Sequence, residues 1–191
     1  MSGRVDQEGF TLVELLVVMM LLGIMIGIVV PLMRPERFQL DAALVVVAST
    51  LTAQQRNSVM RQHNIVLALD SANSLIRVHY DLDNDGTVDT GEPTSVIELD
   101  EGVVFGRGGT PARPWGSAMT SMTETQNSMP ALTFRRNGSA SEQTIIYLTS
   151  QRASVTAGSA YREDARAIEV ERATARVRCY SYNSGTWVQT C

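Results

Sequence analysis

Cation binding is the chemistry that the sequence offers most directly, in an acidic segment near the middle of the chain. Oxygen-bearing residues recur there at the spacing of a calcium-binding loop, namely Asp81, Asp83, Asp85, Thr87, Asp89 and Glu92. Asp89 would act through a water molecule, Thr87 would offer its carbonyl, and Glu92 would offer both carboxylate oxygens. Gly86 permits the sharp turn that such a loop needs. The segment is therefore a candidate site for a structural Ca²⁺.

A solvated acidic hairpin is the alternative for the same segment. Its flanks, Leu75–Tyr80 and Thr94–Leu99, alternate like strands, whereas EF-hand loops lie between helices. In favour of the cation, the loop holds five carboxylates and no basic residue, so a divalent ion would relieve their repulsion. The sequence leaves both interpretations open.

No arrangement of residues in the sequence indicates catalysis. His63 and His79 are far apart and share no motif, and the chain has no glycine-rich phosphate loop. The formal net charge of -4 does not favour nucleic acid as a partner through bulk electrostatics. We expect a protein that is not an enzyme and that has no cofactor beyond the candidate Ca²⁺.

A carboxylate at the edge of an apolar segment is the second chemical feature. Leu15–Met33 contains no charged residue, and as a helix it would span roughly 28 Å, close to the thickness of a bilayer core. Because it is apolar on all sides, it predicts a transmembrane helix over residues 10–33 rather than a core helix. A cleaved secretory signal is less favoured, since no small-residue cleavage site follows. Glu14 lies just inside this boundary, as an interfacial residue near a helix N-terminus or as a charge with a specific task.

A short motif surrounds that carboxylate, with the sequence Gly9-Phe10-Thr11-Leu12-Val13-Glu14. It resembles the type III signal of type IV pilins and type II secretion pseudopilins. The resemblance implies that a prepilin peptidase removes residues 1–9 by cutting between Gly9 and Phe10, and that the new N-terminus is then methylated. It also places Glu14 at the fifth mature position, and Pro31 where many pilins carry a helix-loosening proline.

The same resemblance implies that Glu14 acts in assembly. In a helical filament, the new amine of Phe10 on one subunit can meet the Glu14 carboxylate of a neighbour. In a low dielectric this pairing offsets part of the desolvation cost of both charges, and it fixes the axial register. The implied partners are other pseudopilins of the filament tip and body, the prepilin peptidase and the inner membrane. A secreted substrate and an outer-membrane secretin are further candidates.

Residues 34–64 are expected to continue the helix in amphipathic form. One row at helical spacing consists of Phe38, Ala42, Val45, Ala48, Thr52, Gln55 and Val59. A second row consists of Leu40, Leu44, Val47 and Leu51. The two rows indicate either two contact surfaces, one for a sheet and one for a neighbouring subunit, or a single broad core face.

Residues 65–191 form the predicted β-rich periplasmic domain. The expected strands are Ile65–Asp70, Leu75–Tyr80, Thr94–Leu99, Val103–Phe105, Ala131–Arg135, Thr144–Leu148, Arg166–Glu171, Ala175–Tyr180 and Thr186–Gln189. The predicted fold class is therefore α+β, with a long N-terminal helix packed on antiparallel sheets. Loose patterns such as Leu132-Thr133-Phe134 and Ile168-Glu169-Val170 resemble the GspH/FimT group of minor pseudopilins and minor pilins.

Two segments lack periodicity, Arg107–Pro130 and the shorter Ser150–Asp164. For the first, disorder is favoured over an adaptable contact surface. Such a surface would consist of Trp115, Met119, Met122 and Met129. The cysteines, Cys179 and Cys191, suit one disulfide across the terminal hairpin in an oxidising periplasm.

A DNA-binding role is the alternative, and it depends on Arg176 and Arg178. Their alternation puts them on one strand face. In FimT-like minor pilins, a Gly-Arg-x-Arg motif near the C-terminus is associated with DNA, and here Ala175 replaces the glycine. Pairing of these arginines with Glu169 and Glu171 is favoured over DNA binding.

The resemblance implies a minor pseudopilin of a type II secretion system, at or near the tip of a periplasmic pseudopilus. Its location would be the inner membrane, with a single span and the C-terminal domain in the periplasm. The alternative is a minor pilin of a type IV pilus, involved in pilus assembly or DNA uptake.

Overall fold

The computed structural model describes residues 11–29, 35–113, 121–156 and 160–191. The chain divides into two compact units, Met1–Pro35 and Glu36–Cys191. The processing residues Gly9 and Phe10 lie outside the described residues, as does Pro31.

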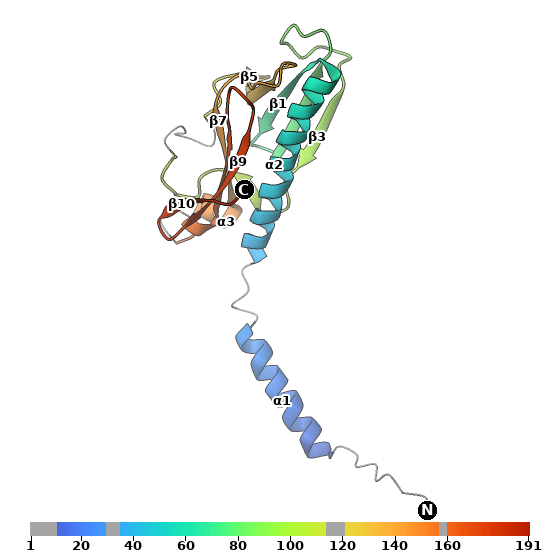
Figure 1. Cartoon of the computed structure of the whole chain (residues 1–191). Coiled ribbons are helices and arrows are strands. Elements are labelled where there is room, and N and C mark those ends of the chain that lie inside the picture. Colours follow the sequence, from blue (N-terminus) through green and yellow to red (C-terminus); the bar gives the residue numbers. More distant parts are fainter. Residues whose placement is uncertain (1–10, 30–34, 114–120, 157–159) are drawn as a thin grey trace, which may run out of the picture. The chain divides into compact units, whose positions relative to one another are not determined.

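The N-terminal unit contains helix α1, Leu12–Val29 (Figure 1). The Thr11 hydroxyl accepts a hydrogen bond from the Glu14 backbone N–H at 3.2 Å, so Thr11 caps the helix. Residues 10 and 30–33 of the predicted transmembrane helix are not described. Within the described ranges, no helix reaches the length and apolarity that a membrane crossing requires. The membrane span therefore remains a prediction.

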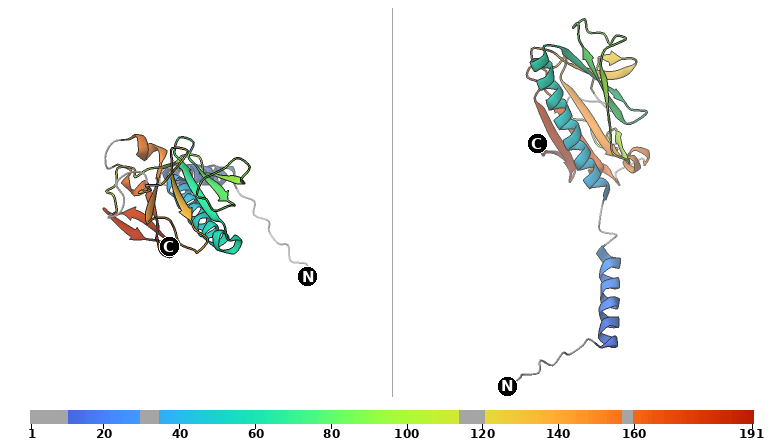
Figure 2. Two further views of the ribbon diagram at one scale, coloured as in Figure 1. Left: turned by 90° about the horizontal axis from the view of Figure 1, so that it is seen from above. Right: turned by 90° about the vertical axis from the view of Figure 1, so that its right-hand side faces the viewer.

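Helix α2, Pro35–Arg61, begins at the boundary between the two units and forms the spine of the C-terminal unit from Glu36 onward (Figures 1 and 2). Pro35 stands at the first helical position, where its missing N–H would have no partner within the helix. Gln62 follows the helix with a φ of 60°, and this left-handed backbone ends it.

Two five-stranded sheets make up the rest of this unit. The first has the order β3-β2-β1-β6-β5, and its strands in chain order are Asn64–Asp70 (β1), Leu75–Asp81 (β2), Thr94–Glu98 (β3), Thr125–Gln126 (β5) and Met129–Phe134 (β6). The second has the order β10-β9-β8-β7-β4, and its strands in chain order are Val103–Phe105 (β4), Thr144–Ser150 (β7), Ala165–Val170 (β8), Val177–Asn183 (β9) and Thr186–Gln189 (β10). Every pair of neighbouring strands is antiparallel, which confirms the predicted α+β class.

One core joins α2 to both sheets. The second row of α2 is buried in it, namely Leu40, Leu44, Val47 and Leu51. The first sheet contributes Leu67 and Phe134, and the second contributes Ile146 and Ile168, all fully buried. The other row of α2 faces outward at Phe38 and Val45, which are 75% and 65% exposed. A single broad core face is therefore wrong for α2, because this other row is largely outside the core, although its Ala48 packs against the core.

The expectation of disorder is wrong for the described parts of Arg107–Pro130. Thr110 is buried, Thr125–Gln126 forms β5, and β6 begins at Met129. The Pro111 carbonyl accepts a hydrogen bond from the Trp187 indole at 3.1 Å. Such contacts with distant strands give the segment its order. Trp115 and Met119 lie outside the described residues.

The second segment without periodicity, Ser150–Asp164, also contains regular structure. Ser150 caps the short helix α3, Gln151–Val155, and a 3-10 turn, η2, covers Arg162–Asp164. The strand predicted at Ala175–Tyr180 lies instead at Val177–Asn183. Its start is later because Ala175 has a φ of 50°, which belongs to a turn and not to a strand.

Candidate functional site

The acidic loop runs between β2 and β3, and its first three aspartates converge. Asp81, Asp83 and Asp85 each offer a carboxylate oxygen, and these atoms lie within 4.8 Å of one another. Asp81 is fully buried as the last residue of β2. Its carboxylate accepts hydrogen bonds from the backbone of Asp85 at 3.2 Å and of Gly86 at 3.0 Å. The sequence pattern therefore does bring these three predicted ligands together.

Glu92 closes the loop from its other end. Its two carboxylate oxygens accept hydrogen bonds from the backbone of Leu82 at 2.7 Å and of Asp89 at 3.0 Å. The first and last predicted ligands, Asp81 and Glu92, are thus both hydrogen-bonded to the backbone of the loop. The flanking elements are strands, so the loop is not built like an EF-hand with two helices.

Electrostatic strain remains within this loop. The pKa of Asp89 is raised, mainly by the negative charge of Asp85, then by burial and by the neighbouring Asp83, Glu92 and Asp81. The pKa of Asp85 is lowered because the backbone and hydroxyl of Thr87 donate hydrogen bonds to its carboxylate. A bound divalent cation would oppose the repulsion at Asp89, because its positive charge would favour the ionised carboxylate.

Two asparagines that the sequence analysis missed fix the loop to the body of the unit. The side chain of Asn84 accepts from the Asn64 backbone N–H at 2.7 Å and donates to the Gln62 carbonyl at 3.4 Å. Asn64 also donates to Asp81 at 3.2 Å. The signal available in the sequence was the asparagine before Asp85-Gly86, because asparagine is common at turns and tolerates a positive φ such as the 63° of Asn84.

The terminal hairpin carries the predicted disulfide. Cys179 in β9 and Cys191 at the chain end are bonded across 12 residues of sequence. The two residues between β9 and β10, Ser184 and Gly185, have positive φ, as a two-residue hairpin turn requires. The bridge holds the C-terminus against the second sheet.

The two arginines of the DNA-binding alternative do not share a strand, because β9 begins at Val177 and Arg176 precedes it. Arg178 lies 4.0 Å from Glu171 in an ion pair. The φ of Ala175, 50°, shows that the left-handed backbone favoured by glycine is retained without a glycine. Arg176 remains exposed at the surface.

A network of charged side chains ties the start of α2 to the second sheet, and we call it the α2 clasp. Its members are Glu36, Arg37, Asp41, Arg152, Glu163, Asp164 and Arg166. Arg152 bridges Glu36 at 2.7 Å and Asp164 at 2.8 Å. Arg37 pairs with Glu163, and Arg166 contacts Asp41 at 2.6 Å. Sequence reasoning missed the clasp because its partners lie far apart in the chain.

Asp164 is the buried centre of the clasp, with 1% of its surface exposed. Burial alone would raise its pKa, but hydrogen bonds from Arg152 and Ser150 and the charges of Arg152 and Arg37 outweigh burial and lower it. Asp164 is therefore held as a carboxylate.

Comparison with known proteins agrees with the N-terminal motif and the fold. Residues 4–30 match the family model described as the prokaryotic N-terminal methylation motif. The chain is similar to a structure of the minor pseudopilin EpsH from the type 2 secretion system of Vibrio cholerae, at a TM-score of 0.50 and 8% identity, over 75% of this chain and 97% of that one. A second structure of the same protein gives a TM-score of 0.47 and 9% identity, over 75% and 94%. No curated protein matches this chain closely enough to count as a relative.

The chain thus combines a match to the N-terminal methylation motif at residues 4–30 with a fold like that of the minor pseudopilin EpsH.

Proposed function

We propose that the chain is a minor pseudopilin of a type II secretion system, a structural subunit without catalytic activity of its own. One observation carries this proposal, the occurrence in a single chain of the methylation motif at residues 4–30 and a domain with the EpsH fold. The chain would be anchored in the inner membrane by its N-terminal segment, with the two-sheet domain in the periplasm. Its position would be at or near the tip of the pseudopilus.

The geometry of α2 supports a role as an assembled subunit. The buried row of α2 completes the core, whereas Phe38 and Val45 project outward. On α1, Glu14 is exposed at the N-terminal turn. Its carboxylate would pair with the amine that cleavage creates on Phe10 of a neighbouring subunit, and charge-assisted hydrogen bonds of this kind are strong in a water-poor environment.

Substitution of Glu14 tests this assembly role. We expect Glu14→Ala to leave the C-terminal unit folded and to reduce incorporation into the filament, because the amine of the neighbour loses its partner in a low dielectric. The measurement is cross-linking of the full chain to partner pseudopilins in membranes. Glu98→Ala, at an exposed glutamate on β3, is the matched control and should cross-link like the wild type. Equal cross-linking in Glu14→Ala would remove the pairing argument.

Deletion of the gene would separate the secretion role from the pilus alternative. A type II pseudopilin predicts loss of exoprotein secretion with normal twitching and transformation. Loss of piliation or DNA uptake with normal secretion would contradict the proposal in favour of a type IV minor pilin.

A further inference from the structure

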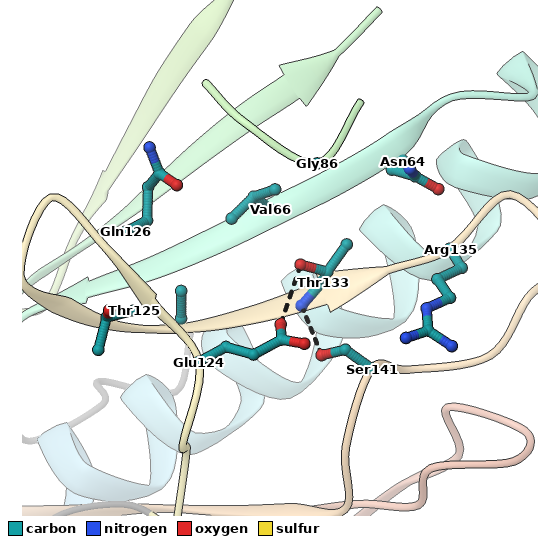
Figure 3. A pocket seen from close by; sticks show the side chains of 10 residues that line it. Asn64, Val66, Gly86, Glu124, Thr125, Gln126, Thr133, Arg135 and Ser141 are labelled. Atoms are coloured by element: carbon teal, nitrogen blue, oxygen red, sulfur yellow. Dashed lines mark hydrogen bonds between the residues drawn. The ribbon is translucent and has the colours of Figure 1, made fainter. Parts of the chain in front are cut away.

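The outer face of the first sheet holds a polar pocket, lined by none of the residues to which we gave a role in assembly (Figure 3). Its volume is about 330 Å³, near the lower end of the range for small-molecule sites. Val66 of β1 and Ala131 and Thr133 of β6 form the floor. The walls come from two segments that lie far apart in the sequence, the acidic loop at Gly86 and residues 124–126, which include β5.

Two opposite charges line this pocket without neutralising each other. Glu124 is half-buried, and one of its carboxylate oxygens accepts a hydrogen bond from the Thr133 hydroxyl at 3.2 Å. Within the described ranges, its other oxygen has no hydrogen-bond partner, and the Arg135 guanidinium has neither an ion pair nor a hydrogen bond. Figure 3 shows Glu124 and Arg135 on opposite sides of Ser141.

The shell of the pocket fixes the carboxylate in place. Thr133 holds Glu124 through its hydroxyl, while its own backbone N–H donates to the Ser141 hydroxyl at 3.1 Å. The Ala131 N–H donates to the Glu124 carbonyl at 2.9 Å, which ties the Glu124 backbone to β6. A carboxylate held against strand β6 in this way is preorganised for a cationic group, and Arg135 supplies a complementary group for an anion.

We propose that this pocket binds an ampholytic peptide group, in which an amine or guanidinium meets Glu124 and a carboxylate meets Arg135. A ligand with a single charge would leave one of the two side chains unpaired, so it would gain less. The hydroxyl and amide groups of Thr125 and Gln126 line the same space and suit the polar backbone of a peptide. The two charges can come from the termini of a short free peptide or from the side chains of a polypeptide segment.

Calorimetric titration of the full chain in detergent micelles tests this site. The probes are glycylglycine, its N-acetyl derivative, its C-terminal amide, and N-acetyl-Lys-Gly-Glu-amide, whose only charges are on side chains. We expect saturable binding of at least one of the doubly charged probes, and weakening by about tenfold or more when one charge is removed. Binding of glycylglycine alone would indicate a free peptide as the source, and binding of the capped tripeptide alone a polypeptide segment.

Variants of the two lining charges complete the test. Glu124→Gln and Arg135→Gln should each weaken binding by about tenfold or more. Arg136→Gln, at the adjacent exposed arginine, and Glu98→Gln, on the distant strand β3, should bind like the wild type. Each titration is run with calcium and with chelator, so that the state of the acidic loop does not decide the result. If Glu124→Gln does not fold, the proposal is tested by the binding of Arg135→Gln and by the binding of the singly charged probes to the wild type.

Two results would overturn the proposal. One is the absence of saturable binding by both doubly charged probes in both conditions. The other is equal binding of a doubly charged probe and its singly charged derivative, which would show that the two charges do not act together.

Discussion

Asp164 shows how one residue can hold two distant parts of this chain together. It lies at the end of the 3-10 turn before β8, yet its carboxylate serves Arg37 on α2 and Arg152 on α3. The Ser150 hydroxyl donates to the same carboxylate at 2.9 Å. Removal of its charge would leave these partners in a partly buried site without compensation.

We expect Asp164→Asn to lower the free energy of unfolding by about 2 kcal/mol at neutral pH, since hydrogen bonds to a charged group are lost. The pKa of Asp164 in the folded protein lies below its ordinary value of 3.8. The contribution of the charge is therefore complete above that ordinary value, and it is lost as the pH falls through the lower folded pKa. Urea unfolding of the full chain at pH values from neutral to acidic measures the difference.

Asp100→Asn is the control for this experiment, because Asp100 is exposed and lies outside the clasp. It should unfold like the wild type at neutral pH. A difference between wild type and Asp164→Asn that stays constant down to strongly acidic pH would contradict the role of the Asp164 charge.

At the scale of elements, the two faces of α2 have different environments, one in the core and one at the surface. Val47 is fully buried in the core, while Val45 is 65% exposed on the outward row. We expect Val45→Glu to change the free energy of unfolding by less than about 0.5 kcal/mol but to weaken cross-linking to partner subunits. Val47→Glu should destabilise the fold by several kcal/mol, since it buries an unpaired charge.

The control for the outward row is Val96→Glu on β3, a site of similar exposure at 47% on another element. It should neither unfold the chain nor affect cross-linking. If Val45→Glu cross-links as well as Val96→Glu, then α2 contributes no contact through this row.

The acidic loop yields a prediction about metal binding. If the loop binds Ca²⁺ only in the folded state, a hundredfold excess over Kd should stabilise the chain by roughly 2.7 kcal/mol. Asp83→Ala is the cleanest variant, because Asp83 is exposed and accepts one backbone hydrogen bond, from Asp85, whereas Asp81 is buried and accepts two. We expect it to abolish the gain, while Asp100→Ala should retain it. Thermal unfolding with calcium and with chelator is the measurement. Identical melting temperatures would favour the alternative interpretation, a solvated acidic hairpin.

Much of the secondary structure could be predicted, because its signals are local. Alternating apolar residues predicted Ile65–Asp70 within one residue of β1, and Thr94–Leu99 within one residue of β3. The order of Arg107–Pro130 could not be predicted, because it depends on tertiary contacts. One is the hydrogen bond from the Ile145 backbone to the Ser121 hydroxyl at 2.9 Å. A segment without periodicity does not indicate such a distant partner in its own sequence.

The same limit applies to the sites. The aspartates of the acidic loop could be predicted because they follow one another at a fixed spacing. The α2 clasp could not, since Arg37 and Glu163 are 126 residues apart and only the fold brings them together. The polar pocket could not be predicted either, because its walls come from segments far apart in the sequence.

At the scale of the whole molecule, we expect N-terminal processing to set where the mature protein begins. The match to the methylation motif covers residues 4–30, and we expect the mature chain to begin at Phe10 with a methylated amine. Mass spectrometry of the protein from its native membrane measures both properties. Replacement of Gly9 by a larger residue should leave residues 1–9 attached, while replacement of Ser2, away from the scissile bond, should not. A mature wild-type chain that starts elsewhere would contradict the processing assignment.

The α2 clasp has a mechanical consequence for a subunit that is pulled by its N-terminus. Tension along the chain would enter the C-terminal unit at the first turn of α2. Arg37, Arg152 and Arg166 link the first two turns of α2 to η2, α3 and β8, so the load is shared among several ion pairs in parallel. Each of these ion pairs would resist separation of the helix from the core. The ion pairs therefore lie where a pull on the N-terminus would enter the domain, at the first turn of α2.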